Sequence, residues 1–351
     1  MKTETPNAVD IIARELGHGA SSPTQSVSGQ RLAGRRGWII SDGMAGHLAI
    51  TRGVAEALGL AVEIKPVAPR APWRHLAPLG PADPRILRAL QAELLPDIVL
   101  GAGRQTVPVV RALKRAGAFT VLFQSPRASS ASAHVIWVPA HDRLRGPNVI
   151  ATLTPPHRFT AQTLAALRRE TPPEIVALPS PRVALLLGGP GAGYSFDAPT
   201  IASFEAQLAT LAESAGSFLI TPSRRTPPAL LQAAERATSA KPRILWDGKG
   251  DNPYPQFLAS ADAFVVTADS VNMTGEACAT GRPVYILAPP GGRAKFRRFH
   301  EALRAHGATC ALADALAGLA GCSYEPVSAA ERVAAEIEAR WRAFRSTTID
   351  R

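Results

Sequence analysis

The chain has 351 residues, of which 46% are hydrophobic, and carries a net charge of +11. This length is enough for two ordinary domains, each with its own core, and no apolar run approaches the ~18–20 residues that span a bilayer. Between Lys65 and Arg127, ten Lys or Arg stand against three Asp or Glu. Such an excess predicts an anionic partner. A phosphate-bearing substrate or acceptor, or the anionic face of a membrane, fits better than nucleic acid, because no recognition helix or aromatic RNA-binding motif accompanies the charge.

Residues 1–35 are polar and rich in Gly and Ser, so we expect a disordered tail without a targeting signal. The three cysteines are far apart and lack the spacing of metal ligands. We therefore expect neither a zinc site nor a disulfide framework, but a cytoplasmic protein. It would lie at the periphery of the inner membrane if its acceptor is membrane-bound.

From Arg36 onward, short apolar runs alternate with helical patterns, which predicts βαβ units and a parallel sheet in an N-terminal domain, 36–170. Its expected strands are 38–40, 61–67, 97–101, 119–124 and 134–139, and its expected helices are 47–59 and 84–95.

The proline-bearing stretch 171–182 predicts a linker, and a second Rossmann-like series occupies 183–325. Its expected strands are 183–189, 217–222, 243–246, 263–268 and 283–287, with helices at 199–215, 227–239, 273–280 and 294–306. Residues 326–351 predict a terminal amphipathic helix that packs back on the N-terminal domain. The predicted architecture is two doubly wound parallel-sheet domains facing a central cleft.

Four strand-end turns are notable, because ligands of parallel sheets bind beyond the carboxyl ends of the strands. They are "SDGMAGH" (41–47), "GAGRQT" (101–106), "GGPGAG" (188–193) and "TADSVNMTGE" (267–276). None is a dinucleotide fingerprint or a P-loop, since "GAGRQT" has Thr106 in place of a third glycine and no GK[ST] occurs. Their repetition in both halves favours a ligand over purely structural turns.

The turns of the second half predict a site for a diphosphate next to a ribose. Arg224 and Arg225 directly follow a strand and could clamp a diphosphate, although either could also lie on a solvated loop. Glu276 could accept two ribose hydroxyls, or could simply complement a helix dipole. The remaining expected diphosphate contacts are Ser270, Asn272 and Thr274, with the N–H groups of their helix. Because no Asp-x-Asp pair occurs, we expect no metal and no cofactor.

The turns of the first half predict the acceptor side. His47 stands where the first loop becomes a helix, so it is the candidate general base, with a structural helix-terminal hydrogen bond as the alternative. The other residues expected at the acceptor loops are Asp42, Gly43, Gly46, Gly101, Gly103 and Arg104.

The stretch "ADAFVVTADSVNMTGEACATGRPVYILAPP" (261–290), with "DGMAGH" and "GGPGAG", resembles the GT-B glycosyltransferases, and its signature is similar to the MurG type. This resemblance implies that a nucleotide-sugar is a substrate, that Glu276 holds the nucleotide ribose and that His47 lies near the reaction centre. It also implies that Gly189 and Gly191 hold the diphosphate together with Ser270, Asn272 and Thr274. Asn272 and Met273 depart from the small residues of that signature.

A longer set of motifs is similar to the mitochondrial-fission ELM (elongated mitochondria) family, whose plant members are fission factors that help to recruit a dynamin-like protein. These motifs are "WIISDGMAGH", "LLLGGPGAGYSFD", "TPSRRTP", "DNPYPQFLASADAFVVTADSVNMTGEACATGRPVY" and "KFRRFHEALRAHG". Three functions stay open: an inverting, metal-independent glycosyltransferase as the leading hypothesis, a nucleotide-sugar epimerase, and a non-enzymatic scaffold. The sequence leaves the base, the sugar, the acceptor and the oligomeric state undetermined.

Overall fold

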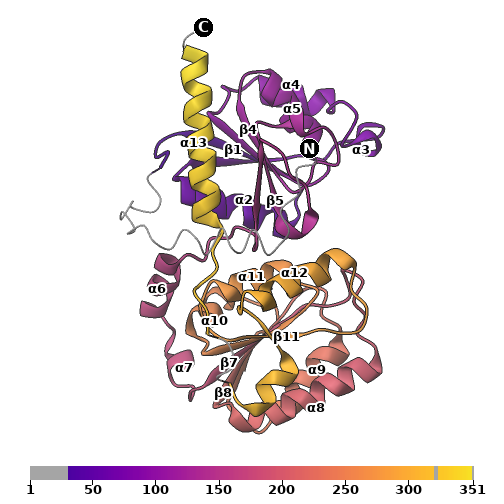
Figure 1. Cartoon of the computed structure of the whole chain (residues 1–351), viewed down its shortest axis with the longest axis vertical. Coiled ribbons are helices and arrows are strands. Elements are labelled where there is room, and N and C mark those ends of the chain that lie inside the picture. Colours follow the sequence, from indigo (N-terminus) through magenta and orange to yellow (C-terminus); the bar gives the residue numbers. More distant parts are fainter. Residues whose placement is uncertain (1–30, 320–322, 350–351) are drawn as a thin grey trace, which may run out of the picture. The chain divides into compact units, whose positions relative to one another are not determined.

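The computed structural model describes residues 31–319 and 323–349 (Figure 1). The chain divides into two compact units. Among the described residues, the N-terminal unit comprises 31–158 and 329–349, and the C-terminal unit comprises 159–319 and 323–328.

The N-terminal unit contains a six-stranded parallel sheet of order β2-β1-β3-β4-β5-β6. Its strands are β1 (Arg36–Ser41), β2 (Ala61–Pro66), β3 (Ile98–Ala102), β4 (Phe119–Phe123), β5 (Val135–Pro139) and β6 (Val149–Thr152). Its helices are α2 (Ala45–Leu58), α3 (Trp73–Leu76), α4 (Pro84–Gln91), α5 (Val107–Arg115) and α13 (Ala330–Ile349), with 3₁₀ turns η1 (Ser130–Ser132) and η2 (Ala140–Asp142).

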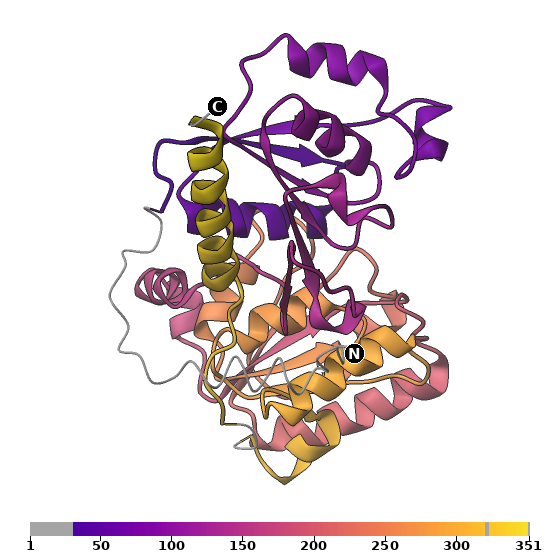
Figure 2. The ribbon, with the colours of Figure 1, turned by 45° about the horizontal axis from the view of Figure 1, so that its top comes forward.

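Helices cover both faces of this sheet, which explains why its central strands read as continuous apolar runs. On one face, Ile39 of β1 belongs to a buried cluster with Val54 of α2 and Ile337 of α13. On the other face, Ile40 packs in a cluster with Val110 of α5. The terminal helix α13 therefore completes the core of the N-terminal unit, and Figure 2 shows it running beside that sheet.

The C-terminal unit contains a second six-stranded parallel sheet, of order β12-β11-β10-β7-β8-β9. Its strands are β7 (Arg182–Leu187), β8 (Ser217–Pro222), β9 (Arg243–Leu245), β10 (Ala263–Thr267), β11 (Val284–Leu287) and β12 (Cys310–Ala311). Its helices are α6 (Ala161–Arg169), α7 (Pro173–Val176), α8 (Ala198–Ser214), α9 (Pro228–Ala237), α10 (Tyr254–Ser260), α11 (Val271–Cys278) and α12 (Ala294–Ala305), with the 3₁₀ helix η3 (Leu312–Ala317). In its core, Leu185 of β7, Phe204 of α8 and Phe218 of β8 are fully buried in one cluster.

Each sheet has one point at which the chain reverses its direction of winding. In the N-terminal unit, the connection after β1 leads to β2 on one side, and the connection after β3 leads to β4 on the other. In the C-terminal unit, the same divergence occurs between β7 and β10. Ligands of doubly wound sheets bind at such switch points, so the loops after these four strands are candidate ligand sites.

Several elements differ from the sequence-based expectations. The unit boundary falls at residues 158 and 159 rather than at 171–182, where α7 and the first residue of β7 are found instead of an open linker. Helix α6 belongs to the C-terminal unit because it packs on α10, and Arg168 Nε donates to the carbonyl of Ala259 at 2.9 Å. Helices α3, α5, α6, α7 and α10 and strands β6 and β12 were not predicted, because most are too short to show a period.

Two smaller expectations also need correction. The predicted tail is too long at its end, because Leu32 is buried in the N-terminal core and its N–H bonds to the carbonyl of Leu58 at 2.8 Å. Residues 1–30 lie outside the described part of the chain. Among the cysteines, Cys278 is free and buried, but Cys310 is disulfide-bonded, contrary to the expectation from spacing.

Candidate functional site

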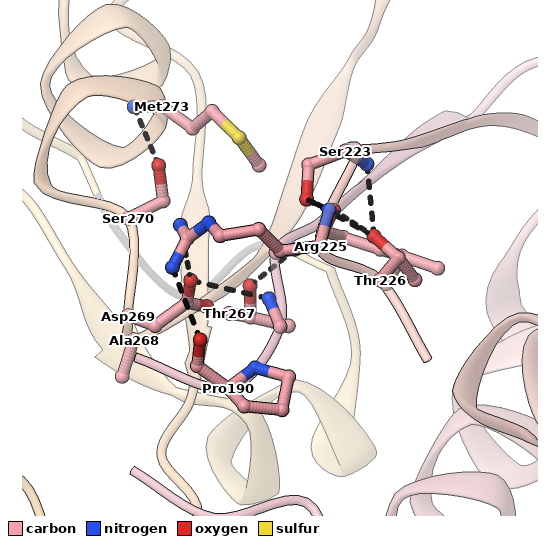
Figure 3. A network of polar contacts seen from close by, with 12 residues as sticks. Pro190, Ser223, Arg225, Thr226, Thr267, Ala268, Asp269, Ser270 and Met273 are labelled. Atoms are coloured by element: carbon pink, nitrogen blue, oxygen red, sulfur yellow. Dashed lines mark hydrogen bonds and ion pairs between the residues drawn. The ribbon is translucent and has the colours of Figure 1, made fainter. Parts of the chain in front are cut away.

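A buried carboxylate organises the switch point of the C-terminal unit. Asp269 follows β10, and its side chain is fully buried. Its Oδ2 accepts the N–H of Gly189, at the end of β7, at 3.1 Å and Nη2 of Arg225, after β8, at 2.8 Å (Figure 3). One side chain thus ties together the loops that follow three neighbouring strands.

The glycines of "GGPGAG" are required by close approach of backbone and side chains. A Cβ on Gly188 would lie 2.2 Å from Oδ1 of Asp269, and one on Gly189 would lie 1.9 Å from the carbonyl oxygen of Arg225. A Cβ on Gly191 would lie 2.3 Å from Nη1 of Arg225. The glycine loop therefore leaves room for the Arg225–Asp269 pair. The three glycines thus have a structural reason to be there, whether or not they also bind a ligand.

The same loop is fastened to the loop that follows β11. The N–H of Gly292 donates to the carbonyl of Gly193, and the N–H of Arg293 donates to that of Ala192, both at 2.8 Å. Tyr194 forms isolated bridges with Gly191 and Gly291. The loops after β7, β8, β10 and β11 therefore form one assembly at the carboxyl edge of the sheet.

The two adjacent arginines have different surroundings. Arg225 bonds to Asp269 and, through Nη1, to the carbonyl of Pro190 at 3.3 Å, while about half of its side chain stays exposed. Arg224 is exposed. The turn that carries both is fixed at its ends, since Ser223 N–H donates to Thr226 Oγ1 at 2.8 Å and Thr226 Oγ1 donates to Leu187 O at 2.7 Å.

Helix α11 begins directly after Asp269, the partner of Arg225. Ser270 is its N-cap, and its Oγ accepts the N–H of Met273 at 3.3 Å (Figure 3). Asn272 is partly exposed in the first turn. Thr274 does not fit the expected phosphate contact, because it is fully buried and its hydroxyl donates to the carbonyl of Ser270 at 2.9 Å. The free N–H groups of the first turn remain the donors available to an anion.

Glu276 lies further along α11 and is 8% exposed. Its Oε2 accepts a hydrogen bond from the hydroxyl of Tyr254, the first residue of α10. Burial, followed by the negative charge of Glu276, raises the pKa of Tyr254 well above its usual value, so the phenol stays protonated and keeps donating. Tyr254 was not singled out from the sequence, because nothing in the sequence around "DNPY" indicates that this tyrosine contacts Glu276, 22 residues further along the chain.

In the N-terminal unit, the switch point holds an aspartate–histidine pair. Asp42 follows β1, His47 lies in the first turns of α2, and Nδ1 of His47 is 3.0 Å from both carboxylate oxygens of Asp42. Gly103, after β3, has a φ of +96°, and a Cβ there would lie 2.1 Å from Asp42 Oδ2 and 2.7 Å from His47 Nδ1. A side chain at this position would displace the pair, so the need for glycine is both conformational and steric.

The pair borders a cavity of about 240 Å³ lined by His47, Gly103, Arg104 and residues of the loop after β4. In that loop, Gln124 and Arg127 have φ angles of +80° and +49°. Such angles are uncommon for residues with side chains and concentrate at functional sites. Neither residue was singled out from the sequence, because backbone conformation of this kind leaves no pattern.

The other residues expected on the acceptor side do not all reach this cavity. Gly43 has a φ of +81° and serves the turn after β1. Gly101 is a packing residue, since a Cβ there would lie 2.5 Å from the side chain of Val110. Gly46 lies in the first turn of α2. Arg104 lines the cavity, and its Nη2 donates to the carbonyl of His75 at 3.0 Å.

Two kinds of feature are absent from the described residues. Within 31–319 and 323–349, no group of three or more His, Cys, Asp or Glu side chains is arranged to hold a metal ion. No helix of the same residues is long and apolar enough to cross a membrane.

The two parallel-sheet units, each with a polar switch point, define the chain as a GT-B-like protein, and solved structures agree with this class. The UDP-GlcNAc 2-epimerase from Methanocaldococcus jannaschii matches 87% of this chain and 99% of its own, with a TM-score of 0.52 and 11% identity. The UDP-GlcNAc 2-epimerase from Neisseria meningitidis, solved bound to UDP-GlcNAc, matches 86% of this chain and 98% of its own, with a TM-score of 0.51 and 13% identity.

The family follows from the sequence. The model of the family described as Mitochondrial fission ELM1 matches residues 45–341, and the chain belongs to that family. The Mitochondrial fission protein ELM1 of Arabidopsis thaliana is 28% identical over 282 residues, covering 72% of this chain and 66% of the plant protein. The uncharacterized protein RP120 of Rickettsia prowazekii (strain Madrid E) is 31% identical over 156 residues, covering 43% and 44%. The chain thus spans less than two thirds of either relative.

Proposed function

We propose that the chain is a metal-independent GT-B glycosyltransferase that binds a nucleotide-sugar donor in its C-terminal unit. The observation that carries this proposal is the assembly of four strand-end loops around the Arg225–Asp269 pair, directly before the N-terminus of α11. Backbone N–H groups, a half-exposed guanidinium and a helix dipole together suit a diphosphate. They would neutralise the charge of the diphosphate without a metal ion.

Within this site, each residue has a separate task. Arg225 binds the diphosphate through the exposed part of its guanidinium, and Ser270 and Asn272 border the phosphates at the helix end. Glu276 accepts the ribose hydroxyls, and Tyr254 orients its carboxylate. Asp269 holds Arg225 and the glycine loop in place without touching the ligand, because it is fully buried. The N. meningitidis structure, bound to UDP-GlcNAc, shows that the fold accommodates a nucleotide-sugar.

The chemistry of transfer is assigned to the N-terminal unit. With Nδ1–H directed at the Asp42 carboxylate, His47 has its Nε2 lone pair available to remove a proton from an acceptor hydroxyl. Asp42 fixes the tautomer and stabilises the imidazolium that forms. The cationic loops beside this pair, with Arg104 and Arg127, suit an anionic or membrane-bound acceptor.

The second candidate is a nucleotide-sugar epimerase, which is favoured by the two solved structures described above. An epimerase needs two acid–base side chains on the sugar ring. The described lining of the N-terminal cavity includes one such group, His47, with Asp42 as its support. Transfer therefore ranks first. A non-enzymatic scaffold, which the name of the plant relative, a mitochondrial fission protein, suggests, ranks third.

The test combines binding with turnover. A thermal-shift panel of UDP-, GDP-, CMP- and ADP-sugars should give one donor class that raises Tm, because a ligand at 100 times its Kd adds about 2.7 kcal/mol of stability. Proton NMR of the same mixture then separates slow donor hydrolysis, expected of a transferase without acceptor, from interconversion of the sugar. Interconversion would replace the transferase with the epimerase, and no shift with any donor would favour the scaffold.

The His47→Ala variant tests the assignment of the base. We expect it to bind the donor as before and to hydrolyse it about 10²–10⁴ times more slowly. His75→Ala is the matched control, because His75 is an exposed histidine of the same unit. Equal loss in both variants, or in neither, would contradict a catalytic role for His47.

A further inference from the structure

The segment between β2 and α4 exposes two leucines on the N-terminal unit. Leu76, at the end of α3, is 46% exposed, and Leu79 is 72% exposed. No Asp or Glu occurs between Val67 and Ala82, whereas Arg70 and Arg74 in the same stretch are exposed. Neighbouring apolar side chains displayed among cations, in a stretch without acidic residues, are typical of an interaction surface.

This segment is held in place by side chains of the connection after β3. Arg104 Nη2 donates to the carbonyl of His75 at 3.0 Å, and Gln105 Nε2 donates to that of Arg74 at 3.2 Å. Arg111 Nη2, on α5, donates to the carbonyls of Leu79, at 3.1 Å, and Gly80. The leucines are therefore presented by a fastened loop, and Figure 1 shows α3 and α5 on the same side of this unit.

Beside Leu79 lies a cationic cavity of about 700 Å³, whose lining includes Arg111, Lys114 and Arg115 of α5 and Ser132 of η1. Ser132 is 1% exposed, and its hydroxyl oxygen has no hydrogen-bond partner among the described residues. A buried, unpartnered hydroxyl beside three cations is suited to bind a polar, anionic group.

The positive charge of the cavity is not compensated within the described chain. None of the ion pairs found among residues 31–319 and 323–349 involves Arg111, Lys114 or Arg115, and Lys114 Nζ donates only to the carbonyls of Ala131 and Ala133, at 2.8 and 3.1 Å. Burial lowers the pKa of Lys114, and burial together with the charge of Arg115 lowers that of Arg111. An anion in the cavity would relieve this cost.

We propose that Leu76, Leu79 and the cationic cavity form a docking surface for an anionic phospholipid bilayer. The two leucines insert into the interface between headgroups and acyl chains, and the cavity receives a lipid phosphate. A bilayer fits better than a protein partner, because the apolar part is limited to two side chains while the charge is concentrated and unpaired. This surface is independent of the nucleotide-sugar site.

Vesicle sedimentation with the full chain tests the proposal. We expect binding to phosphatidylglycerol–phosphatidylcholine vesicles, little binding to pure phosphatidylcholine, and loss of binding in high salt. The double variant Leu76→Ser/Leu79→Ser should reduce the partition coefficient at least tenfold, and Lys114→Gln/Arg115→Gln should remove the preference for the anionic lipid. Unchanged Tm values show that these surface variants fold.

Leu94→Ser is the matched control. Leu94 is 77% exposed in the same unit, but lies in the connection that enters β3 and is not among the residues that line the cavity. Its vesicle binding should equal that of the unaltered chain. Equal binding by the double leucine variant, equal binding to neutral vesicles, or no vesicle binding would overturn the proposal. If glycerol phosphate raises Tm without any vesicle binding, the cavity serves a free phosphate instead and the bilayer is excluded.

Discussion

At the scale of residues, the hydrogen bonds of single side chains determine how the loops at the two switch points are arranged. Asp269 is the clearest case: its sequence position after an apolar strand predicts a place at the sheet edge, but not its burial or its bonds to Gly189 and Arg225. Glu276 and Arg225 were predicted as ligand residues from their strand-end positions, and both lie at this edge of the sheet. Thr274 was predicted with them and is buried instead, because a helix turns every third or fourth residue inward.

The need for glycine at position 103 gives a prediction about the Asp42–His47 pair. In Gly103→Ala, the new Cβ meets both side chains, so we expect the pair to separate and donor hydrolysis to fall about tenfold or more. Gly117→Ala is the matched control, since its φ is +99°, close to the +96° of Gly103, but no atom lies within 4 Å of its Cβ position. Both variants should lose about 1 kcal/mol of stability from backbone strain.

Proton NMR of the His47 ring, with thermal denaturation of each variant, measures the two effects separately. The ring signals should shift in Gly103→Ala and stay in place in Gly117→Ala, at similar Tm. If the His47 signals are the same in both variants, glycine is needed at position 103 only for the backbone conformation of the turn, and not to leave room for the Asp42–His47 pair.

At the scale of elements, α13 packs on the sheet beside a half-buried histidine, His134, that precedes β5. His134 Nδ1 accepts the N–H of Thr120 at 3.1 Å, and its ring stacks on Phe119 and lies 4.8 Å from that of Phe344 on α13. Burial, followed by the positive charge of Lys114, lowers the pKa of His134 to about 4. The neutral ring is thus part of the packing between helix and sheet.

This shift gives the stability of the N-terminal unit a defined pH dependence. The folded pKa lies below the unfolded value of about 6.5, so the unfolded chain binds more protons between these values. Stability is full above pH 6.5 and falls as the pH drops towards 4, by about 1 kcal/mol for a half-buried ring. His134→Asn keeps an acceptor but does not titrate, so its Tm should fall less between pH 7 and 4.5. If Tm depends on pH in the same way in His134→Asn and in the unaltered chain, the protonation of His134 does not contribute to the loss of stability in acid.

The strands of both sheets were largely predictable, because buried parallel strands are continuous apolar runs with turn residues at both ends. The long helices were predictable from their period. Helix α5 was missed although it is nine residues long. Its buried side chains include Val107, Val109 and Val110, and such a short run of β-branched residues favours a strand over a helix. The position of α13 on the N-terminal unit was expected, but its place in the same core as β1 requires tertiary structure.

At the scale of the whole molecule, the sequence predicted two doubly wound units, and the strand orders and solved structures confirm this class. The function follows less directly, because one fold serves several reactions on nucleotide-sugars. We therefore argue function from the sites, and the tasks that we propose are divided between the units: a phosphate-binding edge in the C-terminal unit, and an acid–base pair with a cationic surface in the N-terminal unit.

The most direct test of the proposed donor site is isothermal titration of the best nucleotide-sugar from the panel against three proteins: the unaltered chain, Arg225→Ala and Arg236→Ala. Arg236 is the matched control, because it too forms a charge-assisted pair, with Glu205 at 2.6 Å, and is 58% exposed against 52% for Arg225. We predict that Arg225→Ala weakens binding at least tenfold, as loss of a charged hydrogen bond costs about 1.5–3 kcal/mol, and that Arg236→Ala binds normally. Equal affinity in all three proteins would contradict a donor site at the β7–β10 switch point.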